Sequence, residues 1–319
     1  MKILIVRFSS IGDIVLTTPV VRCLKQQIPG VEIHYITKQS FRQVIEHNPN
    51  IDRFFYIQSS VKEVLPALKK EQYDYVIDLH HNTRTLQLKL ALGVKSFSFD
   101  KLNKEKFMLV HFRMNRLPDK HIVDRYFEAL HPLGITNDRK GLDYFIDPQD
   151  EINTKEFLPD IFSQGYYALV AGGSYYTKRI PENKLKEICT KVKLPLVILG
   201  GPEDAAVAQQ IQDAFPEKAF NACGKVRLNQ SASLIRQAQH VISSDTGLMH
   251  IAAAYKKSIT SVWGNTIPEF GMYPYLPGDG SSILEVKNLG CRPCSKLGFK
   301  KCPKGHFKCM NDLEIPDQL

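Results

Sequence analysis

Short apolar runs alternate with amphipathic segments along the first half of the chain. The runs are rich in β-branched and aromatic residues, as buried strands are. The segments between them, such as residues 40–47 and 61–71, carry apolar residues at helical spacing. This alternation favours βαβ units and a mostly parallel sheet. The predicted strands are Lys2–Val6, Val31–Ile36, Phe54–Ile57, Tyr73–Leu79 and Val94–Phe99. The first helix is expected to have Thr18 as its N-cap and Pro19 at its first position, where the missing N–H of proline costs nothing.

The alternation stops in a polar stretch at residues 136–160 and then resumes. We therefore predict two Rossmann-like, doubly wound α/β domains that face a central cleft, with ligands at the carboxyl ends of the strands. The first domain is expected at residues 1–150 and the second at 151–319. In the second domain the predicted strands are residues 166–173, 194–201, 240–245 and 258–263, and the predicted helices are residues 182–192, 204–215 and 248–255.

The composition narrows the class of protein. Hydrophobic residues make up 43% of the 319 residues and charged residues 24%, as in soluble globular proteins. No apolar stretch approaches the ~20 residues that span a bilayer, and no signal-peptide pattern opens the chain, so we expect a cytoplasmic protein. The net charge of +9 favours anionic ligands or surfaces. Lysines collect at residues 100–107 and 296–308, where a solvated face and a contact with an anionic membrane are equally open.

The loop after the first predicted strand holds the first candidate for catalysis. It contains Gly12 and Asp13 but no G-x-G-x-x-G, and the chain has no P-loop, so nicotinamide-dependent and ATP-hydrolysing functions lose their main support. A carboxylate at a strand end is well placed to act as a general base. Asp13 is equally suited to capping the helical turn that follows, and both roles stay open.

The second candidate site lies at residues 242–254, where a strand, Asp245-Thr246-Gly247 and a helix follow one another. Backbone N–H groups at a helix N-terminus bind phosphate, and His250 lies one turn further along the same face. A capped helix with a core histidine is the plainer alternative. Two other strand ends add Lys178, which can reach a diphosphate, and Glu203, which can hold ribose hydroxyls.

These segments together resemble the ADP-heptose:lipopolysaccharide heptosyltransferases of glycosyltransferase family 9, which have the two-domain GT-B fold. The resemblance is carried by residues 7–37, 172–181 and 243–254 and runs from Met1 to about Asp312. It implies an inverting, metal-independent transfer of heptose from ADP-heptose to a lipopolysaccharide-core acceptor, with Asp13 as general base. It also implies that the donor is bound by Lys178, Glu203, Val226, Asp245, Thr246, Gly247, Leu248 and His250. The chain departs from the family's Trp-Pro pair after the lysine, because Ile180 precedes Pro181 here.

The acceptor side is less sharply defined. His80, His81 and Arg84 follow a predicted strand, where contacts with acceptor phosphates are as open as capping and packing roles. We also assign Ser10, Gly12 and His121 to the acceptor side.

Four cysteines close to the C-terminus form a separate group, Cys291, Cys294, Cys302 and Cys309, with His306 among them. The spacing C-x₂-C-x₇-C-x₆-C opens with a zinc-ligand pair. The alternatives are a structural zinc or another thiolate-bound metal, free buried thiols and, last, disulfides.

The positive charge and the cysteines together also raise a rival function, that of a zinc-containing nucleic-acid-binding protein. No nucleic-acid-binding motif supports that rival, so we expect no nucleic-acid partner. A transferase of the same fold that uses another nucleotide sugar or acceptor is the alternative within the same class. A nucleotide-sugar epimerase and a non-catalytic sugar-nucleotide binder are further rivals.

Overall fold

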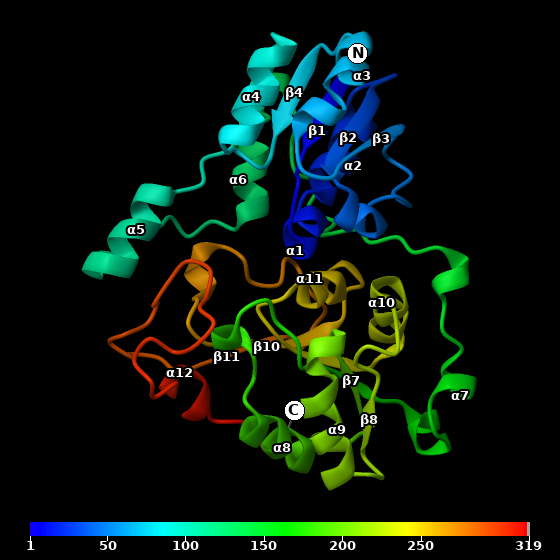
Figure 1. Cartoon of the computed structure of the whole chain (residues 1–319), viewed down its shortest axis with the longest axis vertical. Helices are drawn as coiled ribbons and strands as arrows, with labels where there is room; N and C mark the ends of the chain where they lie inside the picture. The colour runs from blue at the N-terminus through cyan, green and yellow to red at the C-terminus, as the bar shows by residue number, and fades with distance from the viewer. Residues whose placement is uncertain (318–319) are drawn as a thin grey trace. The chain divides into compact units, whose positions relative to one another are not determined.

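The computed structural model describes residues 1–317, which form two compact units. The first unit contains residues 1–102 and 120–145. The second contains residues 103–119 and continues from residue 146 to the end of the described chain. Figure 1 shows strands and helices alternating in each unit. Both units are α/β folds with a fully parallel sheet, which confirms the predicted fold class.

The five predicted strands of the first unit are confirmed, with ends that shift by a few residues. The sheet has the order β3-β2-β1-β4-β5. Its central strand β1 is buried on both faces, as its continuous apolar run predicts. The strands are β1 (Lys2–Val6), β2 (Glu32–Lys38), β3 (Arg53–Ile57), β4 (Tyr75–Asp78) and β5 (Lys95–Ser98). The α-helices of this unit are α1 (Ile11–Val15), α2 (Thr18–Gln27), α3 (Leu65–Lys70), α4 (Thr83–Leu92) and α6 (Ile122–Glu128).

The predicted cap of the first helix is wrong. A short helix, α1, precedes α2, and Thr18 is the first residue of α2 with Thr17 as its N-cap. The physical reason is that both threonine hydroxyls turn back onto α1: Thr17 Oγ1 donates to the carbonyl of Ile14, and Thr18 Oγ1 to that of Val15, each at 2.7 Å. Pro19 is therefore the second residue of α2 and not the first as expected, although it still lies in the first turn.

The sheet of the second unit has the order β11-β10-β9-β6-β7-β8. Its core is formed where β6, β7, β9 and β10 pack against α8, α9 and α12. The strands are β6 (Tyr167–Val170), β7 (Leu196–Leu199), β8 (Ala219–Asn221), β9 (His240–Ser244), β10 (Ser258–Trp263) and β11 (Ser282–Glu285). The α-helices are α5 (Asn103–Phe112), α7 (Thr154–Phe157), α8 (Glu182–Lys191), α9 (Ala205–Ala214), α10 (Leu228–Gln237), α11 (Gly247–Ala254) and α12 (Lys308–Asn311).

Both sheets reverse their strand order at one point. The first reverses between β1 and β4, and the second between β6 and β9. In open α/β sheets a crevice forms outside the carboxyl ends of the two strands at such a reversal, and ligands bind there. The loops after these four strands are therefore where the fold itself places a site.

Helix α5 belongs to the second unit although its neighbours in the sequence belong to the first. Leu109 is buried in a cluster with Ile267 and Phe270, and Val110 and Leu117 pack against that cluster. The alternating pattern did not predict this excursion, and the units change over at residue 146 where we placed the boundary after residue 150. In residues 1–317 no helix is long and apolar enough to cross a membrane.

Arg22 on α2 anchors the segment that follows α6 to the rest of the first unit. Its Nε donates to Asp138 at 2.8 Å, its Nη1 pairs with Asp143, and the guanidinium is only 8% exposed. Hydrogen bonds from Arg22 lower the pKa of Asp138 to about 2, against the effect of burial.

We expect Arg22→Met to lower the free energy of unfolding by about 3–5 kcal/mol, because it leaves two partly buried carboxylates without their cation. The stabilisation by Asp138 is complete above its unfolded pKa of 3.8 and is lost as pH falls through about 2. Thermal unfolding as a function of pH should therefore show a loss of stability between these two pH values. This loss should be smaller in the Arg22→Met variant. Arg42→Met is the matched control, because Arg42 pairs with Glu46 but is 56% exposed; a loss above about 1 kcal/mol there would contradict the argument.

Candidate functional site

A buried arginine organises the loop after β1 in the first unit. Arg7 directly follows the strand, and its Nε donates to the carbonyl of Ser9 at 2.8 Å while Nη1 donates to the carbonyl of Leu79 after β4. Its Nη2 lies 2.6 Å from Oδ1 of Asp13. Burial alone would lower the pKa of Arg7, but the charge of Asp13 raises it above its ordinary value. Arg7 thus joins the two strand ends at the reversal and holds Asp13 between them.

Asp13 is the third residue of α1 and is held from two sides. Besides Arg7, it accepts hydrogen bonds at Oδ2 from the backbone N–H of Ser10 at 3.2 Å and from Ser10 Oγ at 2.7 Å. The capping role that the sequence left open is therefore present, as a capping box with Ser10. The side chain is still 22% exposed. A carboxylate that is fixed in direction and open to solvent retains the geometry of a general base.

His80 and Arg84 both contact Phe8, the residue after Arg7. The His80 ring is 5.2 Å from the Phe8 ring, and the Arg84 guanidinium lies over that ring at 5.8 Å. Burial, followed by the positive charges of Arg7 and Lys101, lowers the pKa of His80 to about 4, so its imidazole is neutral at pH 7. The Nδ1 atom of His80 is buried and has no hydrogen-bond partner within the described chain.

The turn that carries His80 is built on Asp78, the last residue of β4. Asp78 is fully buried, and its Oδ1 accepts the N–H groups of His80 at 3.1 Å and His81 at 2.7 Å, while Lys89 lies 3.0 Å from Oδ2. Burial raises its pKa, but the His81 N–H and Lys89 lower it more, so the pKa is below its ordinary value. The structure thus brings Ser10, Asp13, His80 and Arg84 to one edge of the sheet.

Two of the predicted acceptor-side residues, His121 and Gly12, lie at buried positions in or next to helices. His121 is 2% exposed and is the N-cap of α6, where its Nδ1 accepts the backbone N–H of Val123 at 3.1 Å. Gly12 is buried inside α1. His121 therefore acts as a helix cap and Gly12 is a packing position, and their assignment to the acceptor side stays a prediction.

In the second unit, Lys178 and Asp245 form an ion pair at the reversal between β6 and β9. Lys178 lies at the end of a 3₁₀ turn after β6, and its Nζ is 2.5 Å from Oδ2 of Asp245, which follows β9. Thr266, in the loop after β10, donates its hydroxyl to the same carboxylate oxygen at 3.1 Å. Both charged side chains keep some exposure, 17% and 12%. The ion pair and the Thr266 hydrogen bond therefore connect three loops around Lys178, whose ammonium group is partly exposed.

The N-terminus of α11 directly follows Asp245 of this pair. Both Thr246 and Gly247 lie at the helix N-terminus, as predicted, with Thr246 as the N-cap and the helix beginning at Gly247, one residue earlier than expected. The Thr246 hydroxyl is 3.1 Å from Ser243 Oγ, and the first N–H groups of the helix have no side-chain cap from Thr246. Leu248 is half-buried, and His250 is 2% exposed one turn further on. A helix N-terminus without a side-chain cap, close to a lysine, is suited to binding a phosphate group.

Glu203 and Val226 lie on two turns that approach each other. Glu203 is exposed in the turn after β7, and Val226 is half-buried in the turn between β8 and α10. Gly224 permits the approach, since a Cβ there would lie 2.9 Å from Cα of Pro202, and its φ of +68° suits glycine. The neighbouring Asp204 points inward instead: its Oδ2 accepts the N–H of Gly201 at 2.9 Å, and burial raises its pKa.

Comparison with known proteins places this geometry in a family. Residues 61–301, well over half of the chain, match the family described as "Glycosyltransferase family 9 (heptosyltransferase)". The chain belongs to glycosyltransferase family 9. Lipopolysaccharide heptosyltransferase 1 of Escherichia coli K12 is 26% identical over 296 residues, which cover 84% of this chain and 89% of that protein.

Two solved structures share the fold of this family 9 glycosyltransferase. The glycosyl transferase family 9 protein of Veillonella parvula superposes with a TM-score of 0.71 at 24% identity, over 89% of this chain and 86% of that one. E. coli heptosyltransferase WaaC, solved with ADP, superposes with a TM-score of 0.66 at 22% identity, over 89% of this chain and 92% of that one. The epimerase and nucleic-acid-binding rivals are not favoured by these findings.

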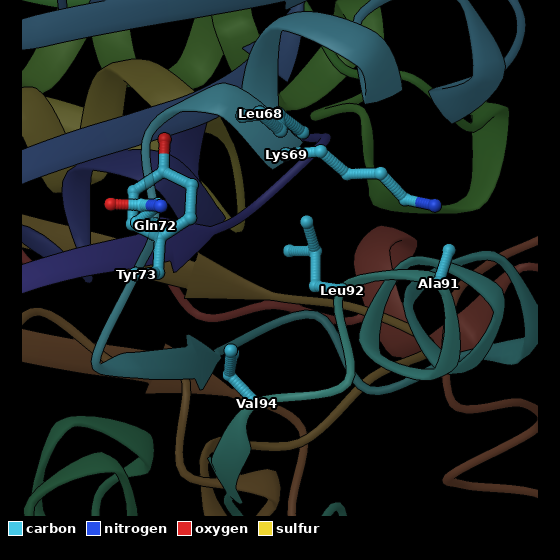
Figure 2. Close-up of a pocket in the computed structure, with 7 residues that line it drawn as sticks. All are labelled: Leu68, Lys69, Gln72, Tyr73, Ala91, Leu92 and Val94. Carbon is cyan, nitrogen blue, oxygen red and sulfur yellow. The ribbon is translucent and has the colours of Figure 1, made fainter.

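A pocket of about 330 Å³ in the first unit of the glycosyltransferase lies away from the reversal between β1 and β4 (Figure 2). It is lined at the ends of α3 and α4 and by Tyr73 and Val94, which precede β4 and β5. This is the amino-terminal edge of the sheet, opposite to the edge that carries Asp13. Its lining in Figure 2 is largely hydrocarbon, so we do not assign the chemistry to it.

The cysteine-rich tail contacts the loops that carry Lys178 and Thr266. Arg292 donates from Nε to the carbonyl of Gly264 at 2.6 Å and from Nη2 to that of Thr266 at 2.9 Å, and its side chain is 6% exposed. Phe299 donates its N–H to Thr177 Oγ1 at 2.8 Å, next to Lys178. Two tail residues therefore hold the loops that carry Thr266 and Lys178.

The four tail thiols lie close enough to influence one another. Burial and then the neighbouring thiols raise the pKa of Cys294 to about 11 and that of Cys309 to about 12. Cys291 Sγ is 3.8 Å from Nε2 of His306. The described residues contain a single group of three candidate ligand atoms within 4.8 Å of one another, and it is Glu32, His34 and Glu71. That group already has a cation in Lys2, which lies 2.7 Å from Glu71 and 3.2 Å from Glu32.

Sequence reasoning missed Arg7, Thr266 and Asn265. The sequence contained a signal for Arg7, which directly follows a buried strand and precedes Gly12 by five residues. A charged side chain in such a position needs a partner. Thr266 acts through a contact that no local pattern predicts. Asn265 is 1% exposed, and within residues 1–317 neither amide atom of its side chain has a hydrogen-bond partner. A buried amide in that state needs a ligand or water to satisfy it.

Proposed function

We propose that this glycosyltransferase moves a heptose from ADP-heptose to a lipopolysaccharide-core acceptor in the cytoplasm, with inversion at the anomeric carbon. The observation that carries the proposal is the complementary chemistry at the two reversals: a held carboxylate in the first unit, and a lysine close to an open helix N-terminus in the second. The family match, and the ADP in the solved WaaC structure, support this choice of donor.

The proposed reaction follows from these charges. Asp13 accepts the proton of an acceptor hydroxyl while that oxygen bonds to the anomeric carbon, and the bond from that carbon to the diphosphate breaks on the opposite face. Arg7 pairs with Asp13 and fixes the direction of its carboxylate, and a general base must be positioned in this way. Negative charge grows on the departing ADP, and Lys178 leaves Asp245 to pair with the diphosphate, together with the N–H groups of α11.

The remaining donor contacts are assigned by position. Glu203 would accept the ribose hydroxyls and Val226 would flank the adenine, since their turns lie together at the same sheet edge. Asp245, Leu248 and His250 would support the diphosphate side. Asn265 joins this set because a bound donor would give its buried amide the partners that it lacks.

The test is release of ADP from ADP-heptose with and without a Kdo–lipid A acceptor. We expect release that depends on acceptor and persists in EDTA, because fixed cations stabilise the leaving group. Loss in EDTA that Mg²⁺ restores would contradict the metal-independent mechanism. Turnover of the donor without acceptor would favour an epimerase or hydrolase instead. Binding of donor without any turnover would leave the sugar or acceptor misassigned.

We further propose that Cys291, Cys294, Cys302 and Cys309 hold a structural metal, because thiolates suit zinc and iron. In the described residues no three of these sulfur atoms lie within 4.8 Å of one another, so a bound ion would have to draw them together. Metal analysis of freshly purified, reduced protein is expected to find about one zinc or iron per chain. Cys291→Ser/Cys294→Ser should lose the metal and bind ADP more weakly, since the tail braces the Lys178 and Thr266 loops. Cys23→Ala, which changes a buried cysteine of α2, is the control that keeps it. A metal content near zero in the wild type would reject the site.

A further inference from the structure

Two lysine-rich segments that lie far apart in the sequence meet on the second unit. Lys296 of the tail donates from Nζ to Asn103 Oδ1 of α5 at 3.4 Å, and Arg113 after α5 donates from Nη1 to the carbonyl of Pro293 at 2.7 Å. The inner face of α5 is anchored through Leu109, which packs on Ile267 and Phe270. In Figure 1, α5 and the orange-to-red tail lie on the same side of the view. We call the exposed side chains of these two contacting segments, residues 103–119 and 292–308, the α5–tail surface.

Large apolar side chains protrude from this surface. Phe107 is 54% exposed and Phe112 60% exposed, and their rings lie 6.1 Å apart; Met114 follows at 40%. The tail adds Leu297 at 55% and Phe299 at 37%. Exposed aromatic and aliphatic side chains on two segments that contact each other indicate a contact with an apolar phase.

Positive charge surrounds these side chains. The tail has no aspartate or glutamate between residues 290 and 311, and the α5 segment at residues 103–119 has only Glu105 and Asp119. The exposed basic residues of the surface are Lys104, Arg113, Arg116, Lys296, Lys300, Lys301, Lys304 and Lys308. Phenylalanine and leucine among lysines is the composition of segments that lie in the headgroup region of an anionic bilayer.

We propose that the α5–tail surface binds an anionic lipid bilayer, with Phe107, Phe112 and Leu297 inserted among the acyl chains and the lysines on the headgroups. Nucleic acid would satisfy the lysines, but its phosphate backbone would not cover Leu297 and Met114, so charge and apolarity together favour a bilayer. Only the biological role of this contact rests on the proposed function, because a lipid-linked acceptor lies at a bilayer. Vesicle binding requires no turnover and is tested separately.

The experiment is flotation of the full chain with vesicles of phosphatidylcholine containing phosphatidylglycerol and with phosphatidylcholine alone. We expect binding to the anionic vesicles and a loss of about tenfold in Phe107→Ser/Phe112→Ser and in Lys300→Glu/Lys301→Glu. The matched controls are Leu90→Ser, an exposed leucine of α4, and Lys155→Glu/Lys193→Glu, two exposed lysines of the second unit outside the surface. Both controls should bind like the wild type.

A fluorescent reporter tests insertion directly. The sole tryptophan, Trp263, is fully buried, so Phe107→Trp adds an exposed probe that brominated lipids should quench when the surface inserts. ADP binding by every variant verifies the fold of the second unit and separates this proposal from the proposed function. Equal binding to both kinds of vesicle, no quenching of the probe, surface variants that bind like the controls, or tight RNA binding in place of vesicle binding would each overturn the proposal.

Discussion

Replacing Asp13 by asparagine is expected to lower the rate of acceptor-dependent ADP release by about 10²–10⁴-fold, with little change in the KM for ADP-heptose. Asparagine keeps the size of the side chain but does not accept the acceptor proton. The loss should therefore fall on kcat, which steady-state assays at saturating donor measure directly. An activity within a few-fold of the wild type would reduce Asp13 to a cap of α1.

The same substitution has a structural cost that requires a control. The Asp13→Asn variant leaves the guanidinium of Arg7, which is 8% exposed, without its carboxylate, so the stability of the variant must be measured by thermal unfolding. Glu63 offers a matched control in the same unit. It caps a short turn at Ser60, accepts three backbone N–H groups and has its pKa lowered to about 2 by them. We expect Glu63→Gln to lose stability and to keep its activity.

Replacing Lys178 by methionine is expected to lower kcat/KM by about 10²–10³-fold, because a fixed cation at the leaving diphosphate is removed. ADP should also bind more weakly, which calorimetry measures without turnover. Lys193→Met is the control, since Lys193 is exposed in the second unit and takes part in no described ion pair. A Lys178→Met variant that behaves like this control would place the diphosphate elsewhere.

The Asp245→Asn variant distinguishes the contribution of Asp245 to donor binding from that of Lys178. In the described structure Asp245 holds Lys178 at 2.5 Å, so the donor must compete with a carboxylate for the lysine. Removing that charge while retaining the lysine should affect donor affinity less than Lys178→Met does. An equal or larger loss would show that Asp245 contacts the donor itself.

The strands that were predicted most directly are those whose side chains are apolar on both faces. β1 and β7 are continuous apolar runs inside their sheets, and this pattern depends on burial alone. β11 was missed because it is an edge strand with Ser282 and Ile283 exposed. α10 was missed because its buried face contains Asn229, Ser231 and Ser233, so polarity does not mark the side that faces the core.

The candidate site was predictable where its residues lie in the segments that follow strands. Asp245 directly follows β9, and Asp13 and Lys178 lie in the first turns after β1 and β6, so the order of strands and turns brings them to the carboxyl edges of their sheets. The ion pairs and hydrogen bonds that hold them were not predictable, because Arg7 reaches Asp13 and Thr266 reaches Asp245 through side-chain geometry that exists only after the sheets form. The departure at Ile180 has a simple consequence in the structure: that side chain is 3% exposed and fills the core of the second unit.

The excursion of α5 limits how members of this family exchange their halves by recombination. The chain passes between the units after residues 102, 119 and 145, so one crossover does not exchange a whole unit. A hybrid joined near residue 150 would place Leu109 and Val110 of one parent on Ile267 and Phe270 of the other. Shuffled genes should therefore yield well-folded proteins only when the α5 contacts of the two parents match, or when the α5 segment is inherited together with the C-terminal half.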